Sequence, residues 1–120
     1  MNEPKHKVVL TQYFMEWYNS LTEDEQDTIQ ANIIILQQYG YQLGRPKADT
    51  IHGSKLTNLK ELRIQHEGRP YRAFFVFDPK RNAVLLCGGD KTGDKRFYDK
   101  MIPIAETVYK DYLAENKDHE

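Results

Sequence analysis

Three charged residues fall on one face of a predicted β-hairpin, and their types suit the binding of an anion. The hairpin joins two segments in which apolar and polar side chains alternate, as is typical of β-strands. If residues 66–69 form its turn, Arg63 faces Arg72 directly and Glu61 shares their face. Two facing arginines repel each other unless something holds them. The pattern therefore favours either a bound anion such as phosphate or a salt-bridge network of Glu61, Arg63 and Arg72 that needs no ligand.

The segment that follows the last apolar run contains several basic residues and two well-separated glycines. Gly88 and Gly93 have the spacing of a Walker phosphate loop, but Asp94 stands where that loop requires lysine. A nucleotide-binding loop of this type is therefore excluded. What remains is a strand-to-helix turn, and Lys91 and Lys95 beside a helix N-terminus could still hold a phosphate there.

Three strands and their turns predict the sheet that must position these groups. Residues 59–65, 71–77 and 82–88 alternate with a period of two and are separated by short turns, which predicts an antiparallel meander. Alternation places one set of side chains under the helices, on the face opposite the arginines. This set consists of Leu62, Ile64, Tyr71, Ala73 and Phe75.

Helix signals surround the predicted meander. Residues 6–10 predict a short edge strand, and Thr11 then caps a short helix. Thr22 and Glu25 form a capping box for a second helix, which Gly40 ends. Two helices joined by so short a turn make an antiparallel helical hairpin.

The rest of the chain predicts a loop and one more helix. Residues 40–58 predict a loop, because they combine glycine and proline with polar residues. The final helix starts at Thr92 or Asp94, and Pro103 must kink or restart it. Residues 114–120 predict a frayed tail. The whole chain, residues 1–120, then predicts one α+β domain whose helices lie against one face of the sheet.

Composition excludes several classes of protein. The 120 residues carry a net charge of −1, but residues 55–100 carry eleven Lys/Arg and six Asp/Glu, a local charge of +5 that suits a polyanion. The single Cys87 predicts a buried thiol, and the scattered histidines have no zinc-binding spacing, so we expect no metal or other cofactor. No apolar run is long enough to span a membrane and no signal peptide is visible, which predicts a cytoplasmic protein.

Four motifs in order resemble the RelE/ParE superfamily of bacterial toxins, and most closely its HigB-like, phage-related branch. They are LKELRI, YRAFFVFD, GGDKTGDKRFY and IPIAETVYKDYL, and the resemblance covers roughly residues 8–113. It implies a RelE-like fold, in which an N-terminal helical hairpin packs on a twisted antiparallel sheet and a C-terminal helix follows. It also implies the toxin of a type II toxin–antitoxin module. Such a toxin is a metal-independent endoribonuclease that cleaves mRNA on the ribosome and arrests growth, and its partner is a helix-turn-helix antitoxin.

The resemblance also assigns roles to residues. Arg72 matches the family's sheet arginine best, Arg63 is next, and Lys91 occupies the basic position after the last strand. Tyr98 is a looser match, and from its place on the helix it could stack on a base. Glu61 either acts as a base or orients Arg63. The expected RNA contacts are Lys60, Arg69, Lys95 and Arg96.

Two alternatives to the nuclease stay open. Some members of the superfamily act on DNA gyrase and lack a nuclease site, and the overall charge of −1 departs from the basic character usual in these toxins. The chain could also be an inactive phage-derived interaction domain, in which the arginines are paired structurally. The cluster of Arg63, Arg72 and Lys91 favours the nuclease.

Overall fold

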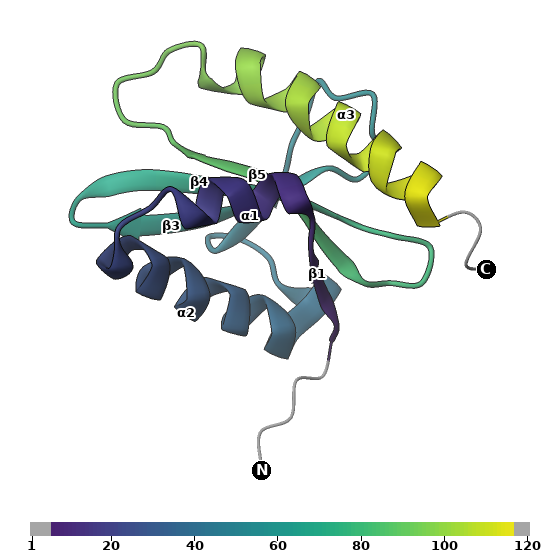
Figure 1. The fold of residues 1–120 in the computed structure, drawn as a ribbon, viewed down its shortest axis with the longest axis horizontal. Helices are drawn as coiled ribbons and strands as arrows, with labels where there is room; N and C mark the ends of the chain where they lie inside the picture. Colours follow the sequence, from purple (N-terminus) through teal and green to yellow (C-terminus); the bar gives the residue numbers. More distant parts are fainter. Residues whose placement is uncertain (1–5, 117–120) are drawn as a thin grey trace.

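A five-stranded sheet with helices on both faces makes up the computed structural model, which describes residues 6–116 (Figure 1). The strand order across the sheet is β1-β5-β4-β3-β2. The strands are β1 (Val8–Leu10), β2 (Ala48–Thr50), β3 (Lys60–His66), β4 (Arg69–Phe77) and β5 (Ala83–Asp90). The helices are α1 (Gln12–Asn19), α2 (Glu23–Tyr39) and α3 (Phe97–Asn116), with a short 3-10 helix, η1, at Gly40–Gln42. The α+β class predicted from the sequence is confirmed.

The predicted meander of β3, β4 and β5 is confirmed, but the sheet is mixed rather than purely antiparallel. Strand β1 joins the outer edge of β5 in parallel, while every other neighbouring pair is antiparallel. Strand β2 lies inside the segment predicted as a loop. Its three residues, Ala-Asp-Thr, are too few and too polar to show an alternating pattern, so only pairing with β3 defines them as a strand.

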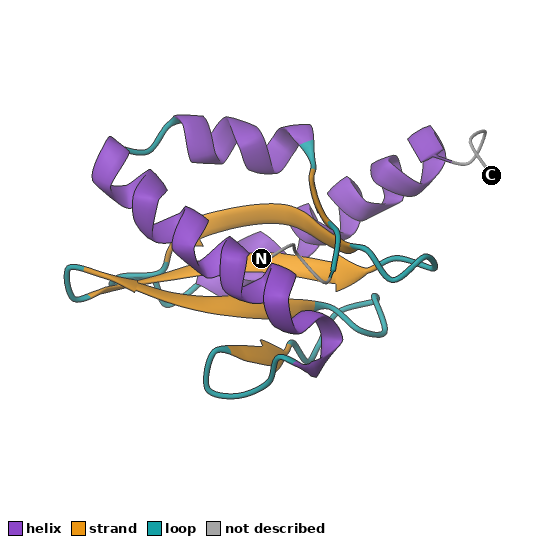
Figure 2. Ribbon diagram, turned by 90° about the horizontal axis from the view of Figure 1, so that it is seen from below, coloured by secondary structure: helices purple, strands orange, loops and turns teal. Residues whose placement is uncertain are grey.

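The helices form two layers, so the expectation that all of them cover one face is wrong. Helices α1 and α2 pack on one face and α3 packs on the other (Figure 2). The predicted inward set on β3 and β4 is confirmed in the first core, beneath the helical hairpin, with Phe14, Ile29 and Leu36. The second core lies under α3 and buries Phe74 and Val76. Sequence alternation defines two faces but does not say that both are covered.

The helix ends follow the predicted signals in the N-terminal half. Thr11 caps α1, and Thr22 with Glu25 forms the capping box of α2. Helix α3, however, continues through the exposed Pro103 without a break, although the missing N–H of that residue removes one backbone hydrogen bond. Of the predicted frayed tail, residues 114–116 form the last residues of α3, and residues 117–120 lie outside the described part.

The paired glycines at the end of β5 allow helices to approach the sheet closely. A Cβ on Gly88 would lie 2.4 Å from the ring of Trp17, and one on Gly89 would lie 3.0 Å from the ring of Phe97. These rings come from α1 and α3, on opposite faces. The glycines are therefore packing positions, and the predicted strand-to-helix turn follows them. The neighbouring Cys87 is buried as predicted, and burial raises the pKa of its thiol to about 12.

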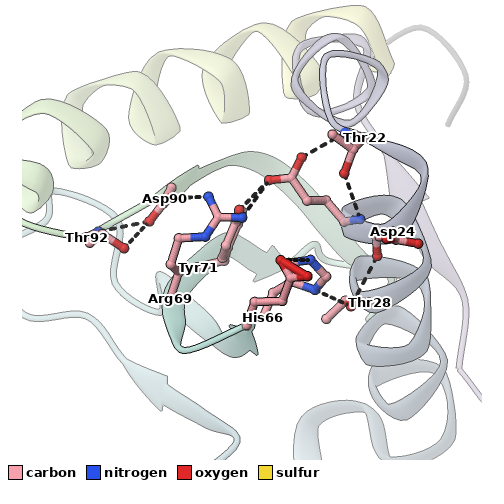
Figure 3. Close-up of polar contacts among 10 residues, drawn as sticks. Thr22, Asp24, Thr28, His66, Arg69, Tyr71, Asp90 and Thr92 are labelled. Atoms are coloured by element: carbon pink, nitrogen blue, oxygen red, sulfur yellow. Dashed lines mark hydrogen bonds and ion pairs between the residues drawn. The ribbon is translucent and has the colours of Figure 1, made fainter.

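A polar cluster fastens the β3–β4 hairpin to α2 (Figure 3). The Tyr71 hydroxyl donates a hydrogen bond to the Glu25 carboxylate, and Arg69 lies between two acids, 3.6 Å from Glu25 and 3.2 Å from Asp90. His66 contacts Thr28 of α2 at 2.7 Å. Tyr71, the Thr22 cap and Arg69 lower the pKa of Glu25 to about 2, with Tyr71 the largest cause.

We expect Tyr71→Phe to destabilise the protein by about 1.5–3 kcal/mol at neutral pH, because Glu25 loses a hydrogen bond to its charged form. A carboxylate whose pKa is lowered on folding contributes stability above its unfolded pKa, and loses it as pH falls. The difference between wild type and variant should therefore shrink between the ordinary pKa of 4.5 and about 2. Urea unfolding at several pH values measures this, and a difference independent of pH would contradict it.

Candidate functional site

The five residues predicted to carry chemistry lie together on the α3 face of the sheet. Glu61 is at their centre. Its Oε2 accepts a hydrogen bond from Arg63 Nε at 3.1 Å, and its Oε1 accepts one from the Tyr98 hydroxyl at 2.6 Å. Arg72 Nε lies 3.4 Å from the same Oε1. Lys91 completes the group, with its Nζ 5.2 Å from the centre of the Tyr98 ring. We call these five residues the Glu61 cluster.

The pairing of β3 with β4 brings the two arginines together. Arg63 and Arg72 are direct partners in the ladder, as predicted. The turn itself is shorter than predicted, since His66 pairs with Arg69 and only Glu67 and Gly68 remain unpaired. Both have positive φ, at 50° and 77°, as a two-residue type I′ turn requires. The register of β3 and β4 nevertheless matches the prediction. The predicted four-residue turn consists of these two unpaired residues and the His66–Arg69 pair that closes the hairpin.

Lys91 and Tyr98 come from the part of the chain that follows β5. Lys91 is the first residue after the strand, and Tyr98 lies in the first turn of α3. The Lys91 backbone N–H donates to Pro70 O at 2.8 Å, which fixes that segment beside β4. The Tyr98 ring packs edge-on against Phe74, at 6.0 Å between centroids. Burial, and then the hydrogen bond to Glu61, raise the pKa of the Tyr98 hydroxyl, while Arg72 partly offsets the shift. Tyr98 is therefore a protonated donor near neutral pH.

Asp49 on β2 is a further member of the site that the sequence did not predict. Arg63 Nη2 donates to its Oδ2 at 3.2 Å, and Arg45 Nε lies 3.6 Å from the same oxygen. Asp49 pairs with Glu61 in the β2–β3 ladder, which places the two carboxylates on either side of the Arg63 side chain. Because residues 40–58 have no strand pattern, nothing in the sequence pointed to this contact.

Exposure decreases steeply across the site. The side chain of Arg63 is 33% exposed, that of Arg72 is 13% exposed and that of Glu61 is 5% exposed. Arg72 Nη1 donates to the carbonyl of Tyr71, whereas its buried Nε is close to Glu61 but not aligned for a hydrogen bond. Lys91 forms no ion pair with any residue in the described range.

The charges of the site leave it cationic. Four bases, Arg45, Arg63, Arg72 and Lys91, lie beside two carboxylates, Glu61 and Asp49, so the local formal charge is +2. The carboxylates hold the guanidinium groups in place and leave other N–H groups for a ligand, because each arginine has five donors. Such an arrangement suits an anion with several oxygens, such as a phosphodiester.

The four residues predicted to contact RNA lie in two different places, two in strands and two in the turn before α3. Lys60 and Arg69 occupy strand positions on the helical-hairpin face, where Lys60 contacts Thr50 and Arg69 contacts Glu25. They therefore do not join the Glu61 cluster. Lys95 and Arg96 are exposed in the turn before α3, near Tyr98 in the chain. The RNA-binding roles of these four residues stay predictions.

Two other properties of the described part bear on function. Between residues 6 and 116, no three His, Cys, Asp or Glu side chains gather closely enough to hold a metal ion. None of the helices in that range is both long and apolar enough to cross a lipid bilayer.

The fold and the Glu61 cluster define an α+β protein with a cationic site on one sheet face. The chain belongs to the family described as phage derived protein Gp49-like (DUF891), which it matches over residues 16–110.

Two curated proteins of Mycobacterium tuberculosis (strain ATCC 25618 / H37Rv) are similar to the chain. The protein named "Putative toxin HigB3" is 41% identical over 108 residues, which cover 89% of this chain and 93% of that protein. The protein named "Putative toxin HigB2" is 38% identical over 104 residues, which cover 85% of this chain but 52% of that protein. The chain thus spans about half the length of the second relative. No solved structure matches significantly.

Proposed function

We propose that the protein is the toxin of a type II toxin–antitoxin module, and that it is an endoribonuclease whose active site is the Glu61 cluster. The observation that carries the proposal is the side-by-side pair of Arg63 and Arg72, supplemented by Lys91 and Tyr98. The names of the two similar proteins support the toxin assignment, and the resemblance to the RelE/ParE superfamily supports the reaction.

RNA supplies its own nucleophile for this reaction. The 2′-hydroxyl gives its proton to solvent water as its oxygen attacks the adjacent phosphorus, the bond from phosphorus to the 5′-oxygen breaks, and that oxygen takes up a proton, so that a 2′,3′-cyclic phosphate and a 5′-hydroxyl result. Negative charge gathers on the phosphoryl oxygens in the transition state. Arg72 and Arg63 are fixed by Glu61 and Asp49 before the substrate arrives, so they stabilise that charge without reorganising.

Tyr98 and Lys91 fit the remaining tasks. The raised pKa keeps the Tyr98 phenol protonated, and its proton, held by Glu61 at rest, can pass to the leaving 5′-oxygen, which is a stronger base than a phenolate. Lys91, which has no ion pair among the described residues, offers a point charge to a phosphate. Glu61 accepts from Arg63 and Tyr98 and lies against Arg72, so we assign it the positioning of those groups, one of the two roles predicted for it.

The partners in this proposal are mRNA on the ribosome and a helix-turn-helix antitoxin. A second candidate function is a non-catalytic toxin of the same fold, for example one directed at DNA gyrase. One observation favours this second candidate. Glu61 pairs with both Arg63 and Arg72, so the two arginines are held together without a bound ligand.

The reaction predicts a strict requirement for one hydroxyl group. We expect the purified protein to cut RNA and leave 2′,3′-cyclic phosphate ends. If free RNA is not cut, the assay uses ribosomes that are translating a message. An otherwise identical message with a single 2′-deoxy nucleotide at the cleavage site should resist cutting there and be cut elsewhere. Cleavage of the deoxy-substituted position at the normal rate would rule out attack by the 2′-oxygen.

A further inference from the structure

Strand β1 forms one edge of the sheet, and no described strand pairs with its outer side. The Lys7 carbonyl and the Thr11 N–H both bond to the β5 backbone, at 2.9 and 3.2 Å. Because alternate residues of a strand bond to the same neighbour, Lys7, Val9 and Thr11 direct their backbone groups toward β5. The N–H and C=O groups of Val8 and Leu10 therefore point outward, where another strand could pair with them.

An apolar groove adjoins this edge on the helical-hairpin face. It has a volume of about 280 Å³, and its lining comes from β1, α1 and α2 and consists of Leu10, Met15, Tyr18, Gln30, Ile33 and Ile34. Leu10 is 40% exposed and Ile34 is 54% exposed, so two large apolar side chains meet solvent here. The polar groups of the groove satisfy each other, since the Gln30 amide donates to the Tyr18 hydroxyl.

A second groove lies on the other side of β1, against α3. It has a volume of about 370 Å³, and Val9 and Tyr13 contribute apolar surface to it. Asp111 and Glu115 of α3 also line this groove, and both are exposed. Neither carboxylate forms an ion pair with any other described residue. The second groove is therefore negatively charged along the helix.

The strand edge and the two grooves together specify the kind of ligand that fits. A chain that pairs with Val8 and Leu10 must be extended, and its successive side chains then point to opposite faces of the sheet. One set of side chains enters the apolar groove. The alternate set lies beside Asp111 and Glu115, where lysine or arginine is favoured. The edge thus fits a segment in which apolar and basic residues alternate.

We propose that the outer edge of β1 holds such a segment of the antitoxin, which adds a sixth strand to the sheet. The inference rests on the proposed function, because the toxin–antitoxin module supplies the protein partner. Strands β5 and β4 separate β1 from β3, which carries Glu61, so β1 lies roughly 14 Å from that strand. The segment therefore fastens the antitoxin to the toxin without entering the Glu61 cluster.

Hydrogen exchange measures strand addition directly. The probe is the purified helix-turn-helix protein encoded beside the gene for this chain, added in excess to the full chain. We expect the amide hydrogens of Val8 and Leu10 to exchange roughly tenfold more slowly in the complex, because they become hydrogen-bonded. The amide of Glu67, in the β3–β4 turn, should exchange at the same rate in both states. A complex in which the Val8 and Leu10 amides keep their free rates would overturn the inference, since the antitoxin would then dock elsewhere or as a helix.

Two substitutions separate the backbone contacts from the charge. Leu10→Pro removes one outward N–H, keeps the bonds from β1 to β5, and should weaken antitoxin binding about tenfold. Asp111→Lys reverses an exposed charge in the second groove, and should weaken binding about tenfold at low salt and less at high salt. Glu67→Lys is the matched control, because it reverses an exposed charge far from β1 and should bind like wild type.

Folding and cleavage are measured beside binding. All three variants should cleave RNA at the wild-type rate, and thermal unfolding identifies any loss of structure. Asp111→Lys changes only an exposed side chain, so it carries the test if Leu10→Pro does not fold. Wild-type affinity of Asp111→Lys and of a folded Leu10→Pro would overturn the inference and leave the toxin assignment in place. If the wild-type chain binds no antitoxin, the proposed function fails and the inference fails with it.

Discussion

Replacing Arg72 with lysine is expected to slow RNA cleavage by about 10²–10³-fold, which is the usual effect of removing one preorganised donor to a developing oxyanion. Lysine keeps the positive charge beside Glu61 but loses the planar fork that can contact two phosphoryl oxygens. The variant should therefore fold normally and bind RNA almost as well as wild type. Single-turnover cleavage of an end-labelled message gives the rate. Binding of the same message, 2′-O-methylated so that the 2′-oxygen cannot attack, gives the affinity.

Lys55→Ala is the matched control, because it removes an exposed charge outside the Glu61 cluster and should leave the rate unchanged. Thermal unfolding of each variant excludes loss of structure. If Arg72→Lys cleaves as fast as wild type, Arg72 does not stabilise the transition state, and the arginine pair is the structural network alone.

Replacing Phe75 with alanine is expected to lower the free energy of unfolding by about 3–5 kcal/mol. Phe75 is 1% exposed, lies in the core beneath the helical hairpin, and packs edge-on against Phe77 at 5.6 Å between ring centroids. The cavity left by the ring cannot close without moving α1 or α2. Urea unfolding of both proteins measures the difference.

Ile34→Ala provides the comparison for that experiment. Ile34 is 54% exposed on α2, so its truncation leaves no buried cavity. It should change the free energy of unfolding by less than about 1 kcal/mol. Equal destabilisation by the two substitutions would mean that the hairpin face is not the core it is described to be.

The sequence predicted best those features that depend on neighbouring residues. Side-chain alternation defined both faces of β3 and β4, and the short turn made Arg63 and Arg72 partners. The capping box of α2 was likewise visible, because Thr22 and Glu25 are three residues apart.

The features that the sequence did not predict depend on contacts between distant segments. Strand β2, and with it Asp49, exists through pairing with β3 and has no pattern of its own. The parallel direction of β1, and the packing of α3 on the second face, depend on how the chain crosses the sheet. By contrast, Lys60 alternates with Glu61 and has the parity of Leu62 and Ile64, so the same alternation already placed it on the face opposite Glu61, and the strand pairing agrees.

The central claim is tested most directly by inducing the protein in a bacterial host without an antitoxin and mapping the 5′ ends of cellular RNA, beside an Arg72→Ala control. The account predicts new ends inside translated codons in the wild-type culture, absent from the control, together with growth arrest that the control lacks. Growth arrest with intact mRNA, or the same new ends in both cultures, would contradict it.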